Sequence, residues 1–385
     1  MGSYFEKINY LMPTRIVADK NALDGIGEEV AGLGKKAFIV TGKNSARKHG
    51  YTQRVIDSLK KNNIDSVIYE KIEPNPDVVL IDEGGKIAKS ENCDFVIGLG
   101  GGSAIDAAKG IAAVVSENKS VWDFVEGYVI EKNILPIVAI PTTAGTGTET
   151  TPYSVISNKK IKRKDGFGSN FIFPKISILD PILTISLSPY YTASTGIDTL
   201  AHAIEAYTSV FASPISDLFA IEAIRLVGKN LRTAVADGKN IDARTNMLFA
   251  SALAGVAIAN PDTTIAHVIG EAFGAVHDTD HGVSIAIALP PVMEYNCVSN
   301  FEKYANITKL LDGDSFNLSL RDMAFKSADS VRNLIKDIKL PLRYSDLGIK
   351  DNKGILDLAL REGTRNSNPR SLSNEEFEKI INACI

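Results

Sequence analysis

The first half of the chain alternates short β-branched runs with stretches of helical spacing, and this alternation constrains the fold more than any other feature. Residues 36–41 (KAFIVT) and 94–99 (DFVIGL) predict buried strands, and residues 51–62 between them predict a helix. Strands that return to one sheet through helices form right-handed crossovers, so we expect a mostly parallel sheet. Further strands are predicted at 65–69, 135–140 and 176–179, and further helices at 78–89 and 103–115.

The character of the sequence changes near residues 180–189. Beyond that point strand signals are sparse, and Ser188-Pro189 is typical of a helix start, with a capping hydroxyl before a proline in the first turn. A length of 385 residues also favours more than one domain. We therefore expect an α/β domain with a Rossmann-like parallel sheet over residues 1–185 and an all-helical domain over residues 186–385.

Composition excludes several classes of protein. The net charge of −4 offers no basic field for a nucleic-acid backbone. No apolar run approaches the roughly 18 residues that a membrane helix needs, and residues 1–10 show no signal peptide. The three cysteines form no CxxC pair, so we expect reduced thiols and a cytoplasmic protein.

A glycine-rich turn is the first sign of a ligand. The predicted strand 94–99 runs directly into Gly100-Gly101-Gly102-Ser103 and then into a predicted helix. Glycines there let the backbone approach a phosphate, and the helix start offers free amides and a positive dipole end. The segment is neither a GxGxxG fingerprint nor a P-loop, and a purely structural turn is the alternative. Its position between a strand and a helix favours phosphate binding.

A second segment, PTTAGTGTE over residues 141–149, follows the predicted strand 135–140. Its hydroxyls and glycines can bind phosphate, ribose or a nicotinamide amide, and a polar turn-rich loop is the alternative. Both segments lie at carboxyl ends of strands, where open α/β sheets bind their ligands. Together they predict a dinucleotide site.

The end of the first strand indicates which dinucleotide is bound. NAD-selective sites usually place an acid there to hold the adenosine 2′-hydroxyl, whereas this chain has Gly42. Four residues that could accept a 2′-phosphate follow: Lys43, Ser45, Arg47 and Lys48. We therefore expect NADP(H) rather than NAD(H), with a solvated basic loop as the alternative interpretation.

The second half contains four of the five histidines, in two short segments. Asp198 and His202 are four residues apart, which places both on one face of a helix. His267 lies in an apolar run, where an unpaired imidazole would be costly. One buried histidine is usually an ordinary core residue, but an aspartate with three histidines forms a mixed oxygen and nitrogen set that suits Fe²⁺ or Zn²⁺ without distinguishing them.

These motifs resemble the iron-containing (group III) alcohol dehydrogenases. The resemblance spans nearly the whole length, in order: Thr41-Gly42-Lys43, Pro74-Asn75-Pro76, GGGSAIDAAK (100–109), IPTTAGTGTE (140–149), GIDTLAHAIEAY (196–207), AHVIGEAFGAVHDTDHG (266–282) and LPPVMEYN (289–296). It implies a two-domain fold with the active site in the cleft between the domains. Members are commonly homodimers or larger assemblies, so a homo-oligomer is expected.

The resemblance also implies roles for individual residues. The implied metal ligands are Asp198, His202, His267 and His281. The implied pyrophosphate contacts are Gly101, Gly102, Ser103 and Asp106, and the nicotinamide side would be lined by Thr142, Thr143 and Thr146. Further cofactor contacts are implied at Asn75, Thr151, Lys164 and Leu183, and Gly42 stands where relatives that use NAD carry an acid.

This chain departs from the family pattern near the third and fourth ligands. Glu271 stands where many members have a histidine, and Asp280 stands where many have a proline. We expect Asp280 to be a partner of a ligating imidazole. His277 is an additional titratable group, and Glu271 and His277 are the candidates for a catalytic proton relay.

The sequence therefore predicts a metal-dependent alcohol dehydrogenase or aldehyde reductase that transfers hydride between NADP(H) and a small primary alcohol or aldehyde. A glycerol or polyol dehydrogenase is an alternative within the same class. Two functions outside that class stay open: a lyase similar to dehydroquinate synthase, which recycles a bound NAD, and a non-catalytic scaffold that keeps the fold.

Overall fold

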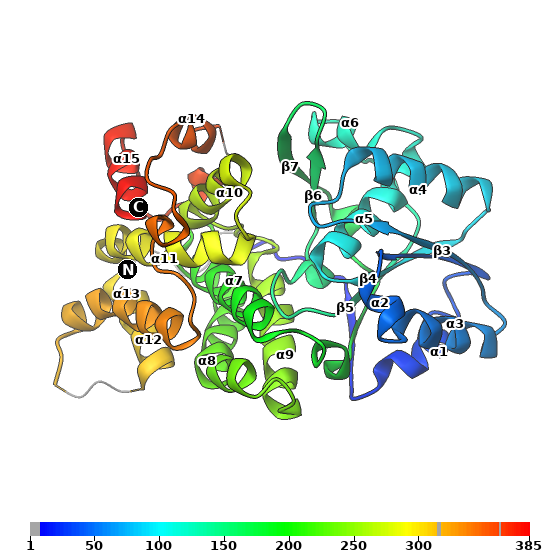
Figure 1. The fold of residues 1–385 in the computed structure, drawn as a ribbon, viewed down its shortest axis with the longest axis horizontal. Helices are drawn as coiled ribbons and strands as arrows, with labels where there is room; N and C mark the ends of the chain where they lie inside the picture. The colour runs from blue at the N-terminus through cyan, green and yellow to red at the C-terminus, as the bar shows by residue number, and fades with distance from the viewer. Residues whose placement is uncertain (1–7, 314–316, 362) are drawn as a thin grey trace. The chain divides into compact units, whose positions relative to one another are not determined.

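A six-stranded parallel sheet lies at the centre of the first half of the chain, in the strand order β1-β8-β5-β4-β2-β3 (Figure 1). The computed structural model describes residues 8–313, 317–361 and 363–385. The sheet strands are β1 (Arg15–Ala18), β2 (Lys36–Gly42), β3 (Asp65–Ile72), β4 (Phe95–Gly100), β5 (Ile137–Pro141) and β8 (Ile176–Leu179). Every pairing in the sheet is parallel, which confirms the prediction.

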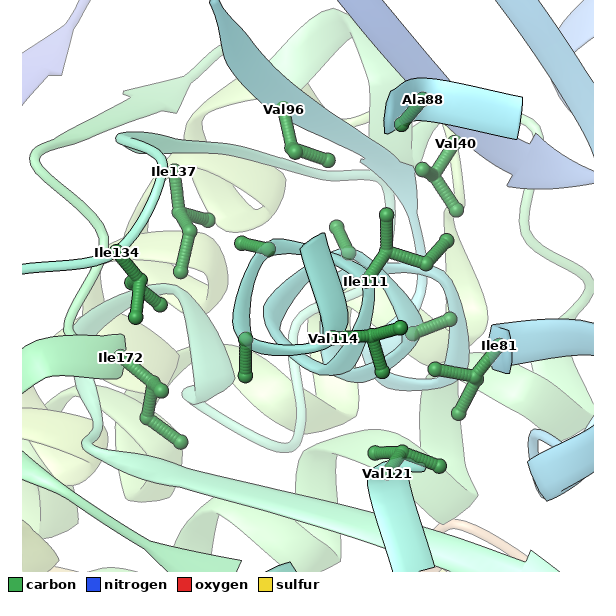
Figure 2. Packing of buried hydrophobic residues seen from close by; sticks show 14 of the residues in the cluster. Val40, Ile81, Ala88, Val96, Ile111, Val114, Val121, Ile134, Ile137 and Ile172 are labelled. Carbon is green, nitrogen blue, oxygen red and sulfur yellow. The ribbon is translucent and has the colours of Figure 1, made fainter. Parts of the chain in front are cut away.

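Apolar residues on both faces explain why this sheet is buried. Successive side chains of a strand point to opposite faces, and β2 places Phe38 and Val40 in one apolar cluster and Ile39 in another. Figure 2 shows the first cluster, in which α5 (Gly102–Glu117) lies among labelled side chains of the sheet (Val40, Val96, Ile137) and of α4 (Val78–Ser90), namely Ile81 and Ala88. Helices α1 (Ile26–Glu29) and α3 (Tyr51–Lys61) contribute to the second cluster through Ile26 and Val55. The sheet thus has helices on both faces.

The helices of this first unit are α1 (Ile26–Glu29), α2 (Ser45–Lys48), α3 (Tyr51–Lys61), α4 (Val78–Ser90), α5 (Gly102–Glu117) and α6 (Val121–Val125). The sequence analysis did not predict β1 or the antiparallel hairpin of β6 (Tyr153–Asn158) and β7 (Arg163–Gly168). Strand β1 has only four residues, and β7 (RKDGFG) lacks a β-branched pattern and is largely exposed. Both depend on cross-strand hydrogen bonds that composition does not reveal.

The second unit is helical, as predicted. Its helices are α7 (Pro189–Thr208), α8 (Pro214–Ala236), α9 (Ile241–Ile258), α10 (Ile265–His277), α11 (His281–Asn296), α12 (Phe301–Asp312), α13 (Leu320–Asp337), α14 (Ile355–Ala359) and α15 (Asn374–Ala383). The Ser188 hydroxyl accepts a hydrogen bond from the Tyr191 amide, which confirms the predicted start of α7. Short 3₁₀ turns complete the two units: Ala22–Gly25, Thr148–Thr150, Asn170–Ile172, Pro181–Thr184, Cys297–Ser299, Tyr344–Leu347 and Gly363–Ser367.

The chain divides into one compact unit of residues 13–187 and another of residues 188–385 with the described residues 8–12. We expected residues 8–12 in the α/β domain. They lie instead on the helical unit, where Tyr10 stacks on Phe219 with ring centroids 6.2 Å apart and its hydroxyl donates to the Val256 carbonyl at 2.5 Å. The three cysteines, Cys93, Cys297 and Cys384, are buried and form no disulfide. Among the described helices none has the length and apolarity to span a membrane.

Candidate active site

Three helices of the second unit carry the predicted metal ligands. Asp198 and His202 lie one turn apart on α7, His267 lies in the first turn of α10, and His281 is the first residue of α11. Two glycines let these helices approach closely. A Cβ at Gly282 would lie 2.1 Å from the Ser194 carbonyl oxygen on α7, and a Cβ at Gly270 would lie 2.4 Å from Ile285 Cδ1 on α11. Close backbone packing therefore brings the ligand-bearing turns together.

The ligand atoms converge on Asp198. Its Oδ1 lies 3.6 Å from Nε2 of His267 and 3.5 Å from Nε2 of His281. Asp198, His267 and His281 each offer a ligand atom within 4.8 Å of the others. The fourth predicted ligand, His202, lies beside this group, with its Nδ1 3.9 Å from Asp198 Oδ1 and its ring stacked on that of His267 at 4.5 Å.

Burial makes this group of charges unusual. Asp198 is 2% exposed and His267 is 4% exposed. Among the described residues, neither Asp198 Oδ1 nor His267 Nε2 has a hydrogen-bond partner. A buried carboxylate oxygen and ring nitrogen without partners are costly, and a divalent cation bound by both would remove that cost. The donor set of carboxylate oxygen and imidazole nitrogen, without thiolate, fits Fe²⁺ or Zn²⁺.

The pKa values of the group follow from the same geometry. Burial alone would raise the pKa of Asp198, but the charges of His202, His281 and His267 hold it well below its ordinary value. Burial alone would lower the pKa of His267, but Glu205 and Asp198 raise it to about 10.

A carboxylate that the sequence analysis missed contacts the metal group. Glu205 lies on α7, and its Oε2 is hydrogen-bonded to Nδ1 of His267. Burial alone would raise the pKa of Glu205, but His267 and hydrogen bonds from Thr264 and Ala266 hold it below its ordinary value. The spacing of Asp198, His202 and Glu205, at intervals of four and three residues, was the only signal for it in the sequence.

Asp280 has a different role from the one we expected. Its Oδ1 accepts hydrogen bonds from the Val283 amide at 3.2 Å and from the Ser194 hydroxyl. It is the N-cap residue of α11 and therefore links the start of α11 to α7. The carboxylate that contacts a ligating imidazole is Glu205.

The two predicted relay residues lie on α10. His277 is the last residue of the helix, and its ring stacks on Phe273, which in turn stacks on Tyr344 with ring centroids 3.5 Å apart. Its Nε2 is buried and has no hydrogen-bond partner in the part of the chain that the structure describes. Glu271 is half-buried. Neither belongs to the group of converging ligand atoms, so a relay through them stays a prediction.

The predicted phosphate turn is formed by Gly100–Ser103, between β4 and α5. Gly100 has φ +154°, a conformation that favours glycine, and Gly101 is the N-cap of α5 with no side chain over the free amides. A Cβ at Gly102 would lie 2.7 Å from Thr146 Cγ2, so the second predicted segment lies directly against this turn. The Ser103 hydroxyl accepts a hydrogen bond from the Asn75 amide at 3.2 Å.

Thus the α/β unit brings many of the predicted cofactor residues together. A Cβ at Gly101 would lie 3.3 Å from Thr143 Cγ2, and the Thr142 amide donates to the Gly100 carbonyl at 2.9 Å. This surface of free amides and hydroxyls, at the carboxyl ends of β4 and β5, can bind an anion.

A buried lysine that the sequence analysis missed lies beneath the predicted cofactor-binding surface. Lys109 is fully buried, and its Nζ donates to Thr148 Oγ1 at 2.7 Å, to the Thr151 carbonyl at 2.9 Å and to the Tyr153 carbonyl at 2.6 Å. Asp106 accepts from the Thr148 hydroxyl at 2.5 Å and from the Val155 amide at 3.1 Å. The polar groups of Asp106 and Thr151 are hydrogen-bonded to other residues of this chain. Their contacts with a cofactor therefore stay predictions.

Burial also shifts the pKa values of this second cluster. It lowers the pKa of Lys109 to about 8, although Asp106 and Glu149 oppose the change. It raises the pKa of Glu149 to about 7. Glu149 is 1% exposed, and its Oε1 accepts no hydrogen bond from the described residues.

Gly42 lies at the end of β2, as predicted, and has open space around it. A Cβ there would meet only the Ile72 carbonyl oxygen, at 3.6 Å. Two acids that the sequence analysis did not consider pair with the basic residues nearby: Glu73 with Lys43 at 2.5 Å, and Glu70 with Arg47. Leu183 is buried in the core and Lys164 is half-buried on β7, and their contacts with a cofactor stay predictions.

Two family models match this chain. The iron-containing alcohol dehydrogenase model matches residues 13–181, and the C-terminal model of the Fe-containing alcohol dehydrogenase family matches residues 192–385. The crystal structure of a 1,3-propanediol oxidoreductase, 36% identical, superposes with a TM-score of 0.95 and covers 99% of this chain and 100% of its own.

Two relatives differ in the cofactor that their names give. The NAD-dependent methanol dehydrogenase of Bacillus methanolicus is 34% identical, over 97% of this chain and 98% of its own. The NADPH-dependent butanol dehydrogenase of Clostridium saccharobutylicum is 32% identical, over 97% of both chains.

Proposed function

Because this chain belongs to the iron-containing alcohol dehydrogenase family, we propose that it transfers hydride between NADP(H) and a small primary alcohol or aldehyde, with Fe²⁺ or Zn²⁺ bound by Asp198, His202, His267 and His281. The observation that carries the proposal is the group of buried ligand atoms around Asp198 Oδ1, which has no hydrogen-bond partner among the described residues. An ordinary core carboxylate would be paired within the protein.

The chain's own residues bind the reactants and carry the proton. When bound, the divalent metal supplies Lewis-acid polarisation of the substrate oxygen, and the nicotinamide supplies the hydride. Gly101, Gly102 and Ser103 bind the pyrophosphate through the start of α5. His277, held against Phe273, can accept or donate the substrate proton through its Nε2, with Glu271 as the other relay residue on α10.

The preference for NADP(H) rests on Gly42. An NAD-selective site would place an acid there, and a glycine offers no carboxylate to repel a 2′-phosphate. Lys43 and Arg47 can turn to that phosphate, because their pairs with Glu73 and Glu70 involve exposed side chains of the two basic residues and such pairs are weak. The names of the relatives include both cofactors, so we base the proposed preference on the local residues.

The test is the initial rate of cofactor oxidation with butanal, under anaerobic conditions with added Fe²⁺. We expect fast oxidation of NADPH and slower oxidation of NADH. Turnover with NADH alone would keep the enzyme class and overturn the cofactor preference. Turnover with neither, while a 3-hydroxyaldehyde is reduced, would favour the diol class named by the 1,3-propanediol oxidoreductase.

Gly42→Asp tests the cofactor preference separately. The new carboxylate should repel a 2′-phosphate and lower the ratio of the kcat/KM values for NADPH and NADH by at least about tenfold. Gly42→Ala is the matched control, because it adds the same Cβ without charge. An unchanged ratio in Gly42→Asp would show that the 2′-phosphate does not bind near β2.

A further inference from the structure

Glu205 lies on α7 with its carboxylate directed at the start of α10. It is 1% exposed, and it follows Asp198 by seven residues and His202 by three, which places all three on one face of the helix. A carboxylate so deeply buried requires partners for both oxygens. Those partners define what it does.

One oxygen, Oε1, accepts hydrogen bonds only from α10 and the residue before it. The donors are the Thr264 amide at 3.1 Å, the Thr264 hydroxyl at 2.5 Å and the Ala266 amide at 2.9 Å, with the His267 amide at 3.4 Å. Thr264 is the N-cap of α10 but makes no side-chain cap bond of its own. Glu205 therefore caps α10 from another helix, and its charge faces the positive end of the helix dipole.

The other oxygen, Oε2, is hydrogen-bonded to Nδ1 of His267. Because Oε1 is already surrounded by donors, the carboxylate is an acceptor, and Nδ1 must carry the proton. In the neutral ring that can bind a metal ion, the lone pair is then on the second nitrogen, Nε2, which is the atom that lies 3.6 Å from Asp198 Oδ1. The same carboxylate thus fixes the position of the backbone at His267 and the tautomer of its ring.

We propose that Glu205 is a positioning residue that holds His267 as the Nδ1-protonated tautomer with Nε2 free to bind the metal. The inference rests on the proposed metal site and adds to it a residue outside the ligand set. Removal of such partners of ligating histidines typically weakens metal binding by about 10- to 100-fold.

The test compares Glu205→Gln with Asp217→Asn. Both variants replace a carboxylate of the helical unit by an amide, but Asp217 lies on α8 and pairs with Lys303 at 2.8 Å. In Glu205→Gln the side chain can keep its bonds to Thr264 and Ala266 only by turning its NH₂ group to Nδ1. That geometry forces the ring proton onto Nε2 and blocks the metal.

The readout is Zn²⁺ affinity, measured by competition with a chromophoric chelator. Glu205→Gln should bind Zn²⁺ about 10- to 100-fold more weakly than the wild type, and Asp217→Asn should bind it as tightly as the wild type. Equal affinity in Glu205→Gln and the wild type would overturn the role of Glu205 alone. A wild-type protein that binds no Zn²⁺ or Fe²⁺ would overturn the proposed metal site, and the inference with it.

A second measurement determines the tautomer of His267 directly. With ¹⁵N-labelled histidine, the Zn²⁺-loaded wild type should show His267 protonated at Nδ1 and bound through Nε2, and only five histidine rings need to be assigned. A proton on Nε2, or a bond to the metal through Nδ1, would overturn the proposal. In a folded Glu205→Gln protein the Nδ1–H signal of His267 should be lost, a change that a merely structural cap would not cause.

Discussion

Each of the two units buries a cluster of charged side chains, and the two clusters differ in where the positive charge comes from. In the α/β unit Lys109 supplies it, and its Nζ donates to oxygens of Thr148, Thr151 and Tyr153. In the helical unit the ion-pair partners of Asp198 are imidazoles. The hydrogen-bond partners of Lys109 Nζ lie within the protein, whereas the atoms around Asp198 form the proposed site for a cation.

Burial alone does not reveal this difference. Lys109 and Asp198 are both almost fully buried, at 0% and 2% exposed. The difference lies in the hydrogen bonds: those of Lys109 Nζ are all made within its own unit, whereas Asp198 Oδ1 has none among the described residues. A buried charge with hydrogen-bond partners is satisfied within the protein, whereas buried atoms without them that converge with other ligand atoms indicate a bound ion. Variants in each cluster test whether one cluster stabilises its unit and the other binds a metal ion.

The largest effect should come from His267→Ala. Loss of this ligand should reduce the metal content to background and lower the aldehyde reductase rate by more than about 100-fold, because loss of an indirect partner alone can cost that much. The protein should stay folded, as measured by circular dichroism. His49→Ala is the control, since His49 lies in the α/β unit beside Tyr51. Normal metal content in His267→Ala would contradict the ligand assignment.

Lys109→Met should have the opposite effect to His267→Ala: it should lower stability and leave the metal content unchanged. The variant leaves the acceptors of Thr148, Thr151 and Tyr153 without their donor, and breaking such a buried network costs about 3–5 kcal/mol of unfolding free energy. Trp122, the single tryptophan, packs against the apolar cluster of the α/β unit, so its fluorescence in urea reports the unfolding of that unit.

Metal content should be unchanged in Lys109→Met. The exposed Lys60→Met is the matched control and should change the unfolding free energy by no more than about 0.5 kcal/mol. The comparison would be contradicted if Lys109→Met lost its metal while its urea unfolding curve, followed by Trp122 fluorescence, matched that of the wild type. Lys109 would then affect the proposed metal site without stabilising its own unit.

The smallest effect should come from Glu149→Gln and should depend on pH. The folded pKa of Glu149 is about 7, raised by burial from an ordinary value of 4.5. The wild type therefore loses stability as pH rises from about 4.5 to 7, because the unfolded chain ionises first. Glutamine does not titrate, so the stability of Glu149→Gln relative to the wild type should increase over that interval by up to about 3 kcal/mol. A difference that does not change with pH would show that Glu149 has an ordinary pKa in the fold.

Local sequence patterns predicted much of the architecture. The runs KAFIVT and DFVIGL became the buried strands β2 and β4, and the glycines after β4 became the turn before α5. Strand β1 (RIVA) and strand β7 (RKDGFG) lack the continuous buried apolar run that identified β2 and β4, so β1 and the β6–β7 hairpin escaped prediction. Residues 8–12 were placed in the wrong unit because their partners, among them Phe219 and Val256, are more than 200 residues away.

The candidate site shows the same limit. The family resemblance implied Asp198, His202, His267 and His281 as ligands, and the structure brings Asp198, His267 and His281 together with His202 beside them. Glu205 was missed because a glutamate in a helix usually faces solvent, and only the approach of α10 gives its carboxylate partners. Lys109 was missed because the segment AIDAAK does not reveal that its lysine points inward. Asp280 was assigned to a histidine ring from proximity in sequence, whereas it caps α11.

The most direct test is a metal titration of the wild-type protein. The chain is stripped with a chelator and then titrated anaerobically with Fe²⁺, while bound metal and the initial rate of NADPH oxidation with butanal are both measured. Our account predicts about one ion per chain, as for a single catalytic ligand set with an open position for substrate, and a rate that rises in proportion to bound metal from almost zero. A full rate in the stripped protein would contradict it.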